Sequence, residues 1–326
     1  MKRSAATDAG RAPLVSIVTP AYNAAPYLAE TTGSVLGQTF SDFEHLIVDD
    51  GSTDETLTEA HRLAATDGRI HVVSTPNGGP ATARNVALRA ARGEFIALLD
   101  SDDLWRPHYL ATQLDILASH PEVSIVTSNA MNLGGGANYD GKPFWPTVTG
   151  LERLTAFDLI SREDSVCILS VMRRSVYDTI GGFNPEFSGN EDYEFWLRAS
   201  LAGLRILRNH EPLAVYRRHS GSLSSDEPKM IRGAVKVLQH IDTLLDEMPQ
   251  ERAALYGQVR RFTRELPRAD LRASLQRSDA ASAARVLRAL AAERGGWTLG
   301  AVARFMTCWP RPLLWAYKLR RSLNSA

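Results

Sequence analysis

An apolar run in the first third of the chain ends abruptly in acidic side chains. Phe95–Leu99 is uncharged and is followed by Asp100, Ser101, Asp102 and Asp103. Such a run predicts a strand buried on both faces of a parallel sheet, and ligands of these sheets bind at the carboxyl ends of the strands. Three crowded carboxylates repel one another, and hard oxygen ligands favour Mg²⁺ or Mn²⁺. The alternative is a helix start, in which Asp102 or Asp103 caps a helix opening near Pro107.

Strand and helix patterns alternate from residue 14 to about residue 128. The expected strands are short apolar or β-branched runs at 14–19, 45–48, 70–73, 95–99 and 123–127, and helical spacing is found at 27–36, 54–65, 80–91 and 107–118. Beyond a glycine-rich, aromatic loop at 134–146, further strands are expected at 169–172 and 213–216, and further helices at 174–180 and 192–202. This alternation predicts an α/β fold with a mainly parallel sheet flanked by helices.

The composition is that of an ordinary globular protein. The 326 residues are 44% hydrophobic and 23% charged, with 37 basic and 37 acidic side chains. Cys167 and Cys308 lie far apart in sequence, which favours a reducing compartment. Residues 1–12 are expected to form a flexible tail rather than a signal peptide, and no apolar run is long enough to predict a membrane-spanning helix. A cytoplasmic location is therefore expected.

From residue 225 the chain is helical in pattern and rich in Ala, Leu and Arg, so we expect a main domain over 13–224 and a helical C-terminal region over 225–326. Its last part is basic, with Arg294, Arg304, Arg311, Lys318, Arg320 and Arg321 and no acidic residue. Aromatic residues are interleaved with these charges, which favours peripheral contact of 296–321 with an anionic membrane, at the inner face of the plasma membrane. Alternatively, the aromatic residues pack on the main domain. Pro310 and Pro312 are expected to break the segment into short helices.

Three more segments carry chemically useful residues at predicted strand ends or helix starts. The first strand runs into Thr19, Pro20, Ala21, Tyr22 and Asn23, the second into 49–54 (DDGSTD), and a third loop at 77–85 reads NGGPATARN. Together with the acidic cluster, in this order, they resemble the nucleotide-sugar-binding half of family 2 glycosyltransferases. The resemblance covers residues 14 to about 224. It implies a GT-A fold and inverting transfer of a sugar from a nucleotide-diphosphate donor, a UDP-sugar, to an acceptor hydroxyl in the synthesis of cell-surface glycans or glycolipids.

The resemblance also implies a donor site, made of Thr19, Pro20, Tyr22, Asn23, Asp50, Arg84, Asp100 and Ser101. Asp50 at a strand end can accept the N3–H of a uracil, although the sequence around it also suits a turn. Arg84, one turn into a helix, can face a base or a diphosphate, although most helical arginines are solvated surface residues.

Metal and base positions follow from the same resemblance. Asp100-Ser101-Asp102 matches the family's metal-binding DXD motif, so Asp102 and Asp100 are expected to bind Mn²⁺ or Mg²⁺, while Asp103 caps the next helix. His219 is a further candidate ligand of the metal or diphosphate, or a structural histidine. Asp192 matches the catalytic base of the family's ED motif, with Glu191 assisting. An acidic first turn after Asn190 also stabilises a helix through its dipole, and both roles are compatible.

Other function classes have less support. A catalytically silent nucleotide-sugar sensor or scaffold would keep the fold, but the intact carboxylates count against it. The first strand is not followed by the G-x-G-x-x-G of a Rossmann dehydrogenase. The basic residues gather in the tail rather than along the site, which disfavours nucleic acid as a partner.

Overall fold

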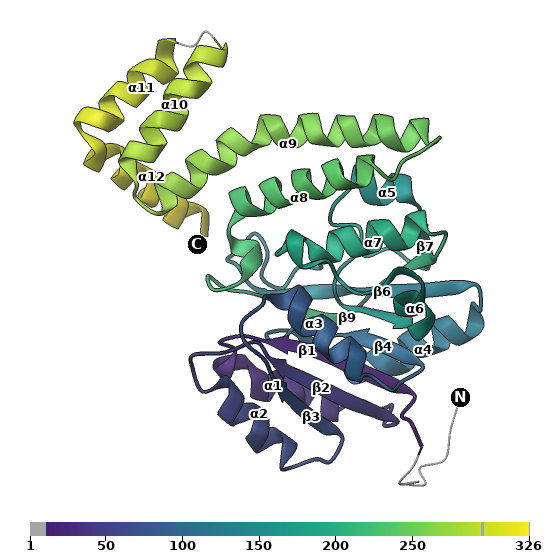
Figure 1. Cartoon of the computed structure of the whole chain (residues 1–326). Helices are drawn as coiled ribbons and strands as arrows, with labels where there is room; N and C mark the ends of the chain where they lie inside the picture. Colours follow the sequence, from purple (N-terminus) through teal and green to yellow (C-terminus); the bar gives the residue numbers. More distant parts are fainter. Residues whose placement is uncertain (1–10, 295–296, 326) are drawn as a thin grey trace.

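The computed structural model describes residues 11–294 and 297–325, so almost all of the predicted tail over 1–12 lies outside the described residues. Figure 1 shows a sheet with helices on both faces and a group of helices that projects from one end. The strands are β1 (Val15–Ala21), β2 (Phe43–Asp49), β3 (Ile70–Ser74), β4 (Phe95–Leu98), β5 (Leu104–Trp105), β6 (Val123–Gly134), β7 (Leu151–Leu154), β8 (Ser170–Arg173) and β9 (Arg205–Arg218). The helices of the first two thirds are α1 (Ala25–Leu36), α2 (Thr56–Ala64), α3 (Pro80–Ala90), α4 (Tyr109–Ser119), α5 (Ala156–Ser161), α6 (Arg174–Ile180) and α7 (Glu191–Leu201).

The strands form one mixed sheet that is mainly parallel. Its order is β3-β2-β1-β4-β8-β6-β9-β5, and β7 also pairs with β9. The first four strands in this order are parallel, β8 is antiparallel to both of its neighbours, and β6 and β9 are again parallel. The predicted α/β class is confirmed. Because the strand order reverses between β1 and β4, the carboxyl ends of these strands lie at a topological switch point, where ligands of such sheets bind.

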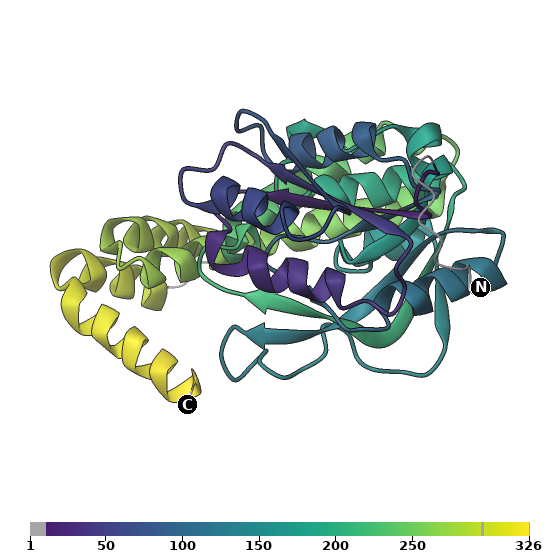
Figure 2. The same cartoon turned by 90° about the horizontal axis from the view of Figure 1, so that it is seen from below.

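Both faces of this half of the sheet are covered, which explains the continuous apolar runs of β1, β2 and β4. One face packs against α1 and α2 through a cluster that includes Leu28, Ile47 and Leu63. The other face belongs to the main core, where Val18 and Val48 share a cluster with apolar residues of α3. Figure 2 shows the helices on either side of the sheet.

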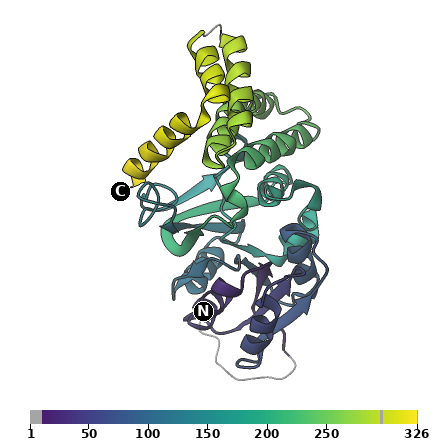
Figure 3. The same cartoon turned by 90° about the vertical axis from the view of Figure 1, so that its left-hand side faces the viewer.

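The C-terminal helices divide into two groups. α8 (Glu227–Asp242) and α9 (Pro249–Gln276) lie over α7, and their residues Ile231, Val237 and Phe262 belong to the main core. α10 (Ala280–Arg294), α11 (Trp297–Cys308) and α12 (Pro310–Ser325) project beyond it and share a small cluster around Met306. Figure 3 shows this projection, with α12 turning back toward the loop that follows β6. The domain boundary near residue 225 remains a prediction.

The tail is broken at the first proline, as expected, because α11 ends at Cys308 and α12 begins at Pro310. Pro312 makes no second break, because it lies in the first turn of the 16-residue α12, where proline is tolerated. In the loop after β6, Trp145 is buried and its Nε1 donates to the Asp164 carbonyl at 2.7 Å, so this ring anchors the loop to the core.

Candidate active site

Asp50 at the end of β2 holds the glycine loop that precedes α3. Its two carboxylate oxygens accept hydrogen bonds from the backbone N–H groups of Gly78 and Gly79, at 2.9 and 2.8 Å. Gly79 has φ of +83°, a conformation that suits glycine. Burial raises the pKa of Asp50, while the two loop N–H groups act in the opposite direction. The carboxylate thus positions the start of α3, and it retains lone pairs for a further donor.

The β1 end supplies the other predicted nucleoside contacts. Thr19 is fully buried and its hydroxyl lies 2.9 Å from His45 Nε2, while Pro20 lies within β1. Tyr22 is 50% exposed at the surface. Asn23 adopts a positive φ of 49°, and its side-chain oxygen accepts from the Thr53 N–H at 2.8 Å. The two strand ends are therefore tied together beside Asp50.

Arg84 bridges two carboxylates that are distant in sequence. One end of its guanidinium donates to Asp100 Oδ1 and the other to Glu191 Oε1, each at 2.6 Å. The side chains of Arg84 and Glu191 are each 5% exposed, whereas that of Asp100 is 29% exposed. Burial alone would lower the pKa of Arg84, but these carboxylates more than offset it and raise that pKa. The bridge joins the end of β4 to the first turn of α7, so Arg84 is not a solvated surface residue.

Asp192 follows Glu191 in that first turn and keeps partial solvent exposure. Its Oδ1 accepts from the Tyr193 N–H at 2.8 Å. Desolvation by the surrounding protein, and then the charge of Glu191, raise the pKa of Asp192 to about 7, although Arg84 acts in the opposite direction. A carboxylate with a pKa near neutrality is suited to accept a proton. Asn190 precedes the helix, but its side chain makes no capping hydrogen bond.

His219 lies against the acidic cluster. This proximity is needed if His219 and Asp102 are both to bind the metal. Its Nε2 lies 2.9 Å from Asp102 Oδ2. Burial and the charge of Asp100 raise the pKa of Asp102, and the hydrogen bond to His219 acts in the opposite direction. Within residues 11–294 and 297–325, no three Asp, Glu, His or Cys side chains are arranged to hold a metal ion. Mg²⁺ is usually held by one or two carboxylates together with phosphate oxygens and water, so the donor set around Asp102 fits such a cation.

The prediction for Asp103 is wrong. Its carboxylate does not cap a helix but accepts from the Arg217 backbone N–H at 2.8 Å, and α4 begins only at Tyr109. The short strand β5 directly follows Asp103 and pairs with β9, which brings the buried carboxylate against that strand. Burial, and then the charges of Asp102 and Asp100, raise the pKa of Asp103. Ser101 is buried, and its carbonyl accepts from the Thr31 hydroxyl at 2.9 Å.

Sequence reasoning missed several residues that support the site. The Tyr27 ring on α1 lies 4.7 Å from the His219 ring, and the Arg217 guanidinium lies 5.1 Å from the same tyrosine. Arg217 Nε also donates to the Asp102 carbonyl at 2.8 Å. No local sequence signal marks Tyr27. The backbone N–H groups of Gly78 and Gly79 were also missed, although the two adjacent glycines signalled a special loop.

Comparisons of the sequence with known proteins find relatives among glycosyltransferases. The family model described as glycosyl transferase family 2 matches residues 16–181. TuaG of Bacillus subtilis, a glycosyltransferase attributed to teichuronic acid biosynthesis, is 34% identical over 233 residues, which are 71% of this chain and 90% of TuaG. The chondroitin synthase of Escherichia coli is 32% identical over 59% of this chain, and the match spans 27% of that larger protein.

Solved structures share the fold. S. aureus TarS 1–349 in complex with UDP-GlcNAc superposes with a TM-score of 0.63 at 23% identity, covering 84% of this chain and 83% of that one. The mannosyltransferase PcManGT of Pyrobaculum calidifontis, in complex with GDP-Man and Mn²⁺, gives a TM-score of 0.60 at 21% identity, covering 98% of this chain and 89% of that one. The predicted GT-A-like sheet with a helical C-terminal region is confirmed. By its family match and by its likeness to TuaG over most of both chains, this chain belongs to glycosyl transferase family 2.

Proposed function

We propose that this glycosyltransferase moves a sugar from a nucleotide-diphosphate donor, a UDP-sugar, to an acceptor hydroxyl with inversion, and that the transfer depends on a divalent metal. The product belongs to a cell-surface glycan or glycolipid, as the attribution of TuaG to teichuronic acid synthesis supports. The observation that carries the proposal is the Arg84 bridge, which joins the acidic end of β4 to the α7 turn that holds Asp192. It connects the expected donor site with a carboxylate suited to be the base.

Asp192 is the proposed general base, and Glu191 holds it in place. Inverting transfer is a single displacement, so one base that takes the proton of the acceptor hydroxyl is sufficient. The raised pKa of Asp192 makes it a stronger base than an ordinary aspartate. Glu191 is fixed by Arg84 on one oxygen and by the Gly189 N–H on the other, at 2.6 Å each, which orients the start of the helix.

The donor is proposed to lie across the ends of β1, β2 and β4. Asp50 receives the base at the nucleoside end, and the cation is held by Asp102 and His219, with Asp100 at the ribose or the metal. A bound Mn²⁺ or Mg²⁺ would offset the charge that develops on the departing diphosphate. The 2.9 Å contact between His219 and Asp102 and the free lone pairs of Asp50 support this orientation.

A panel of nucleotide sugars, with and without Mn²⁺ or Mg²⁺, tests the proposal by donor hydrolysis and transfer. We expect turnover of a UDP-sugar only with metal. Asp192→Asn should abolish transfer while leaving nucleotide binding intact, and the matched control Asp178→Asn, an exposed carboxylate on α6, should behave as wild type. Unchanged transfer by Asp192→Asn would remove Asp192 as the base. Tight binding of a donor without turnover of any would favour the silent sensor instead.

The tail is proposed to contact an anionic membrane. Trp309 and Trp315 are each 66% exposed beside the exposed Arg304 and Arg311, whereas Met306 is buried against α10. The side chains of Trp297, Lys318, Arg320 and Arg321, which belong to the same prediction, lie outside the described residues. No helix in the described ranges is long and apolar enough to cross a bilayer.

Sedimentation with vesicles tests this contact. We expect the full chain to sediment with phosphatidylglycerol vesicles but not with phosphatidylcholine vesicles, because both exposed indole rings and basic groups contribute. Replacing Trp309 and Trp315 by Ala should reduce the bound fraction, while the buried Trp105, Trp145 and Trp196 remain to report folding by fluorescence. Equal sedimentation of the wild type and this double variant would contradict the proposed contact.

A further inference from the structure

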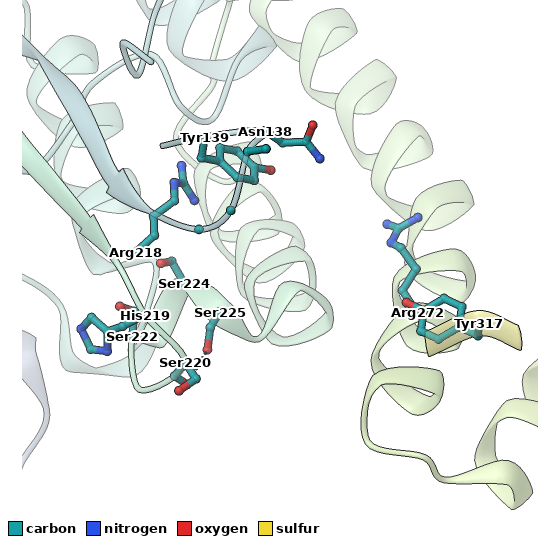
Figure 4. Close-up of a pocket in the computed structure, with 13 residues that line it drawn as sticks. Asn138, Tyr139, Arg218, His219, Ser220, Ser222, Ser224, Ser225, Arg272 and Tyr317 are labelled. Carbon is teal, nitrogen blue, oxygen red and sulfur yellow. Dashed lines mark hydrogen bonds between the residues drawn. The ribbon is translucent and has the colours of Figure 1, made fainter. Parts of the chain in front are cut away.

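A second cavity adjoins the candidate active site. Its volume is about 910 Å³, and it lies between the loop after β6, the end of β9 with its following loop, α9 and α12. Figure 4 shows Tyr139, Arg218 and His219 on one side of it and Arg272 and Tyr317 on the other. His219 belongs both to this lining and to the contact with Asp102. The cavity therefore shares His219 with the metal end of the proposed donor site, while Thr19 and Asp50 do not line it.

The described lining of the cavity is basic. It contains Arg218, His219 and Arg272 and no acidic side chain. Arg272 is ion-paired with Glu227, because its Nε donates to one carboxylate oxygen at 3.0 Å and its Nη2 donates to the other, so most of its charge is offset. Arg218 has no acidic partner among the described residues: its Nε donates to the Asn132 side-chain oxygen at 2.7 Å, and its guanidinium lies 4.2 Å from the centre of the Tyr139 ring. Asn132 and Tyr139 hold this guanidinium in place without cancelling its charge, which suits it to pair with a carboxylate or phosphate.

The rest of the lining suits a hydroxylated chain. Four serine side chains come from the loop after β9, namely Ser220, Ser222, Ser224 and Ser225, and Asn138 adds an amide. Hydroxyl and amide groups donate and accept hydrogen bonds, which matches the hydroxyl groups of a sugar or polyol. The rings of Tyr139 and Tyr317 offer flat apolar faces on opposite sides. The volume lies near the upper end of the range for ligand pockets, so several linked units fit.

We propose that this cavity binds the acceptor, and that the acceptor is a glycan or polyol chain bearing carboxylate or phosphate groups, which pair with Arg218 and lie beside Arg272. The inference rests on the proposed transfer reaction and names the substrate class of its second site. It also gives the C-terminal helices a role, because Arg272 of α9 and Tyr317 of α12 line the cavity opposite the β9 end (Figure 4). The nucleotide does not enter this cavity except at its His219 edge.

Pairs of anionic and neutral oligomers with similar hydroxyl groups test the proposal. Fluorescently labelled hexagalacturonate and its methyl ester share every hydroxyl group, and a glycerol phosphate oligomer beside a neutral glycerol oligomer provides the phosphate arm. We expect the full chain to bind an anionic probe about tenfold more tightly than its neutral partner, an advantage that salt removes. Equal binding of charged and neutral probes in both arms would overturn the proposal.

Single arginine substitutions locate the effect. Arg218→Gln and Arg272→Gln should each weaken binding of the anionic probe by about threefold to tenfold and leave binding of the neutral probe unchanged. The matched control is Arg288→Gln, which replaces an exposed arginine on α10. UDP affinity should be retained in both variants. If UDP binding falls as much as probe binding, the cavity belongs to the donor site and the proposal fails. Absence of hydrolysis of every nucleotide sugar by the wild type would overturn the proposed reaction, and the probe series would still report on the cavity.

Discussion

Removing the Arg84 guanidinium should strongly destabilise this protein. Arg84 and Glu191 are both almost completely buried, so Arg84→Gln leaves a carboxylate without its counter-charge in the protein interior. Breaking a buried ion pair by removing one partner typically costs about 3–5 kcal/mol. The bond to Asp100 adds little, because that carboxylate is 29% exposed and water can replace the guanidinium. We therefore expect a loss of about 3–5 kcal/mol, a large share of the stability of a typical domain.

Urea unfolding followed by tryptophan fluorescence measures this loss. The control Arg232→Gln removes an exposed arginine paired with Asp270 and should cost at most about 1 kcal/mol. The double variant Arg84→Gln, Glu191→Gln should recover much of the stability, because the uncompensated charge is then gone. A loss below about 1 kcal/mol in Arg84→Gln, or no recovery in the double variant, would refute a buried charge bridge.

Three further predictions concern the same site. Transfer activity, measured as kcat/KM, should rise with pH through about 7, because Asp192 must lose its proton to act as a base; a flat profile there would contradict this role. The free energy of unfolding should change in the opposite direction with pH. Asp192 binds its proton more tightly in the folded state, so its contribution to stability falls as pH rises from about 4 to about 7. Asp192→Asn should therefore reduce the pH dependence of the free energy of urea unfolding. Gly51→Ala should lower the free energy of unfolding by at least about 1 kcal/mol, because Gly51 has φ of +70° and a new Cβ would lie 2.6 Å from the Asn77 backbone nitrogen. The variant should also bind UDP more weakly in calorimetry. Wild-type affinity for UDP would show that the loop tolerates the change.

The buried central strands and the residues that directly follow them were predictable because their signals are local, whereas the short strands β5 and β7 were not expected. β1, β2 and β4 are buried on both faces and therefore appear as apolar runs, and Asp50 and Asp100 lie directly after such runs. The order of these runs was enough to place the acidic residues at one edge of a sheet. The predicted helix over 174–180 coincides with α6.

The connections within the site do not follow from local residue patterns, because they join residues far apart in the chain. Arg84 and Glu191 are 107 positions apart, and the proximity of Asp102 and His219, which are 117 positions apart, was expected only from the family resemblance. Asp103 shows how a local rule fails: an acidic residue before a helical pattern suits a cap, but the pairing of β5 with β9 places it against a strand instead. The role of α9 and α12 in the second cavity likewise depends on packing that periodicity does not encode.

Arg84 also affects the pKa of Asp192. A functional role of Arg84 can therefore be distinguished from a purely structural one by experiment. Burial and the charge of Glu191 raise the pKa of Asp192, and Arg84 is the group that opposes them. Losing the guanidinium should therefore raise this pKa further and move the rise of kcat/KM to higher pH. The measurement is made in Arg84→Gln without urea, under conditions where fluorescence shows the variant to be folded. If Arg84 only holds β4 and α7 together, the variant loses stability and the position of the pH profile stays that of the wild type.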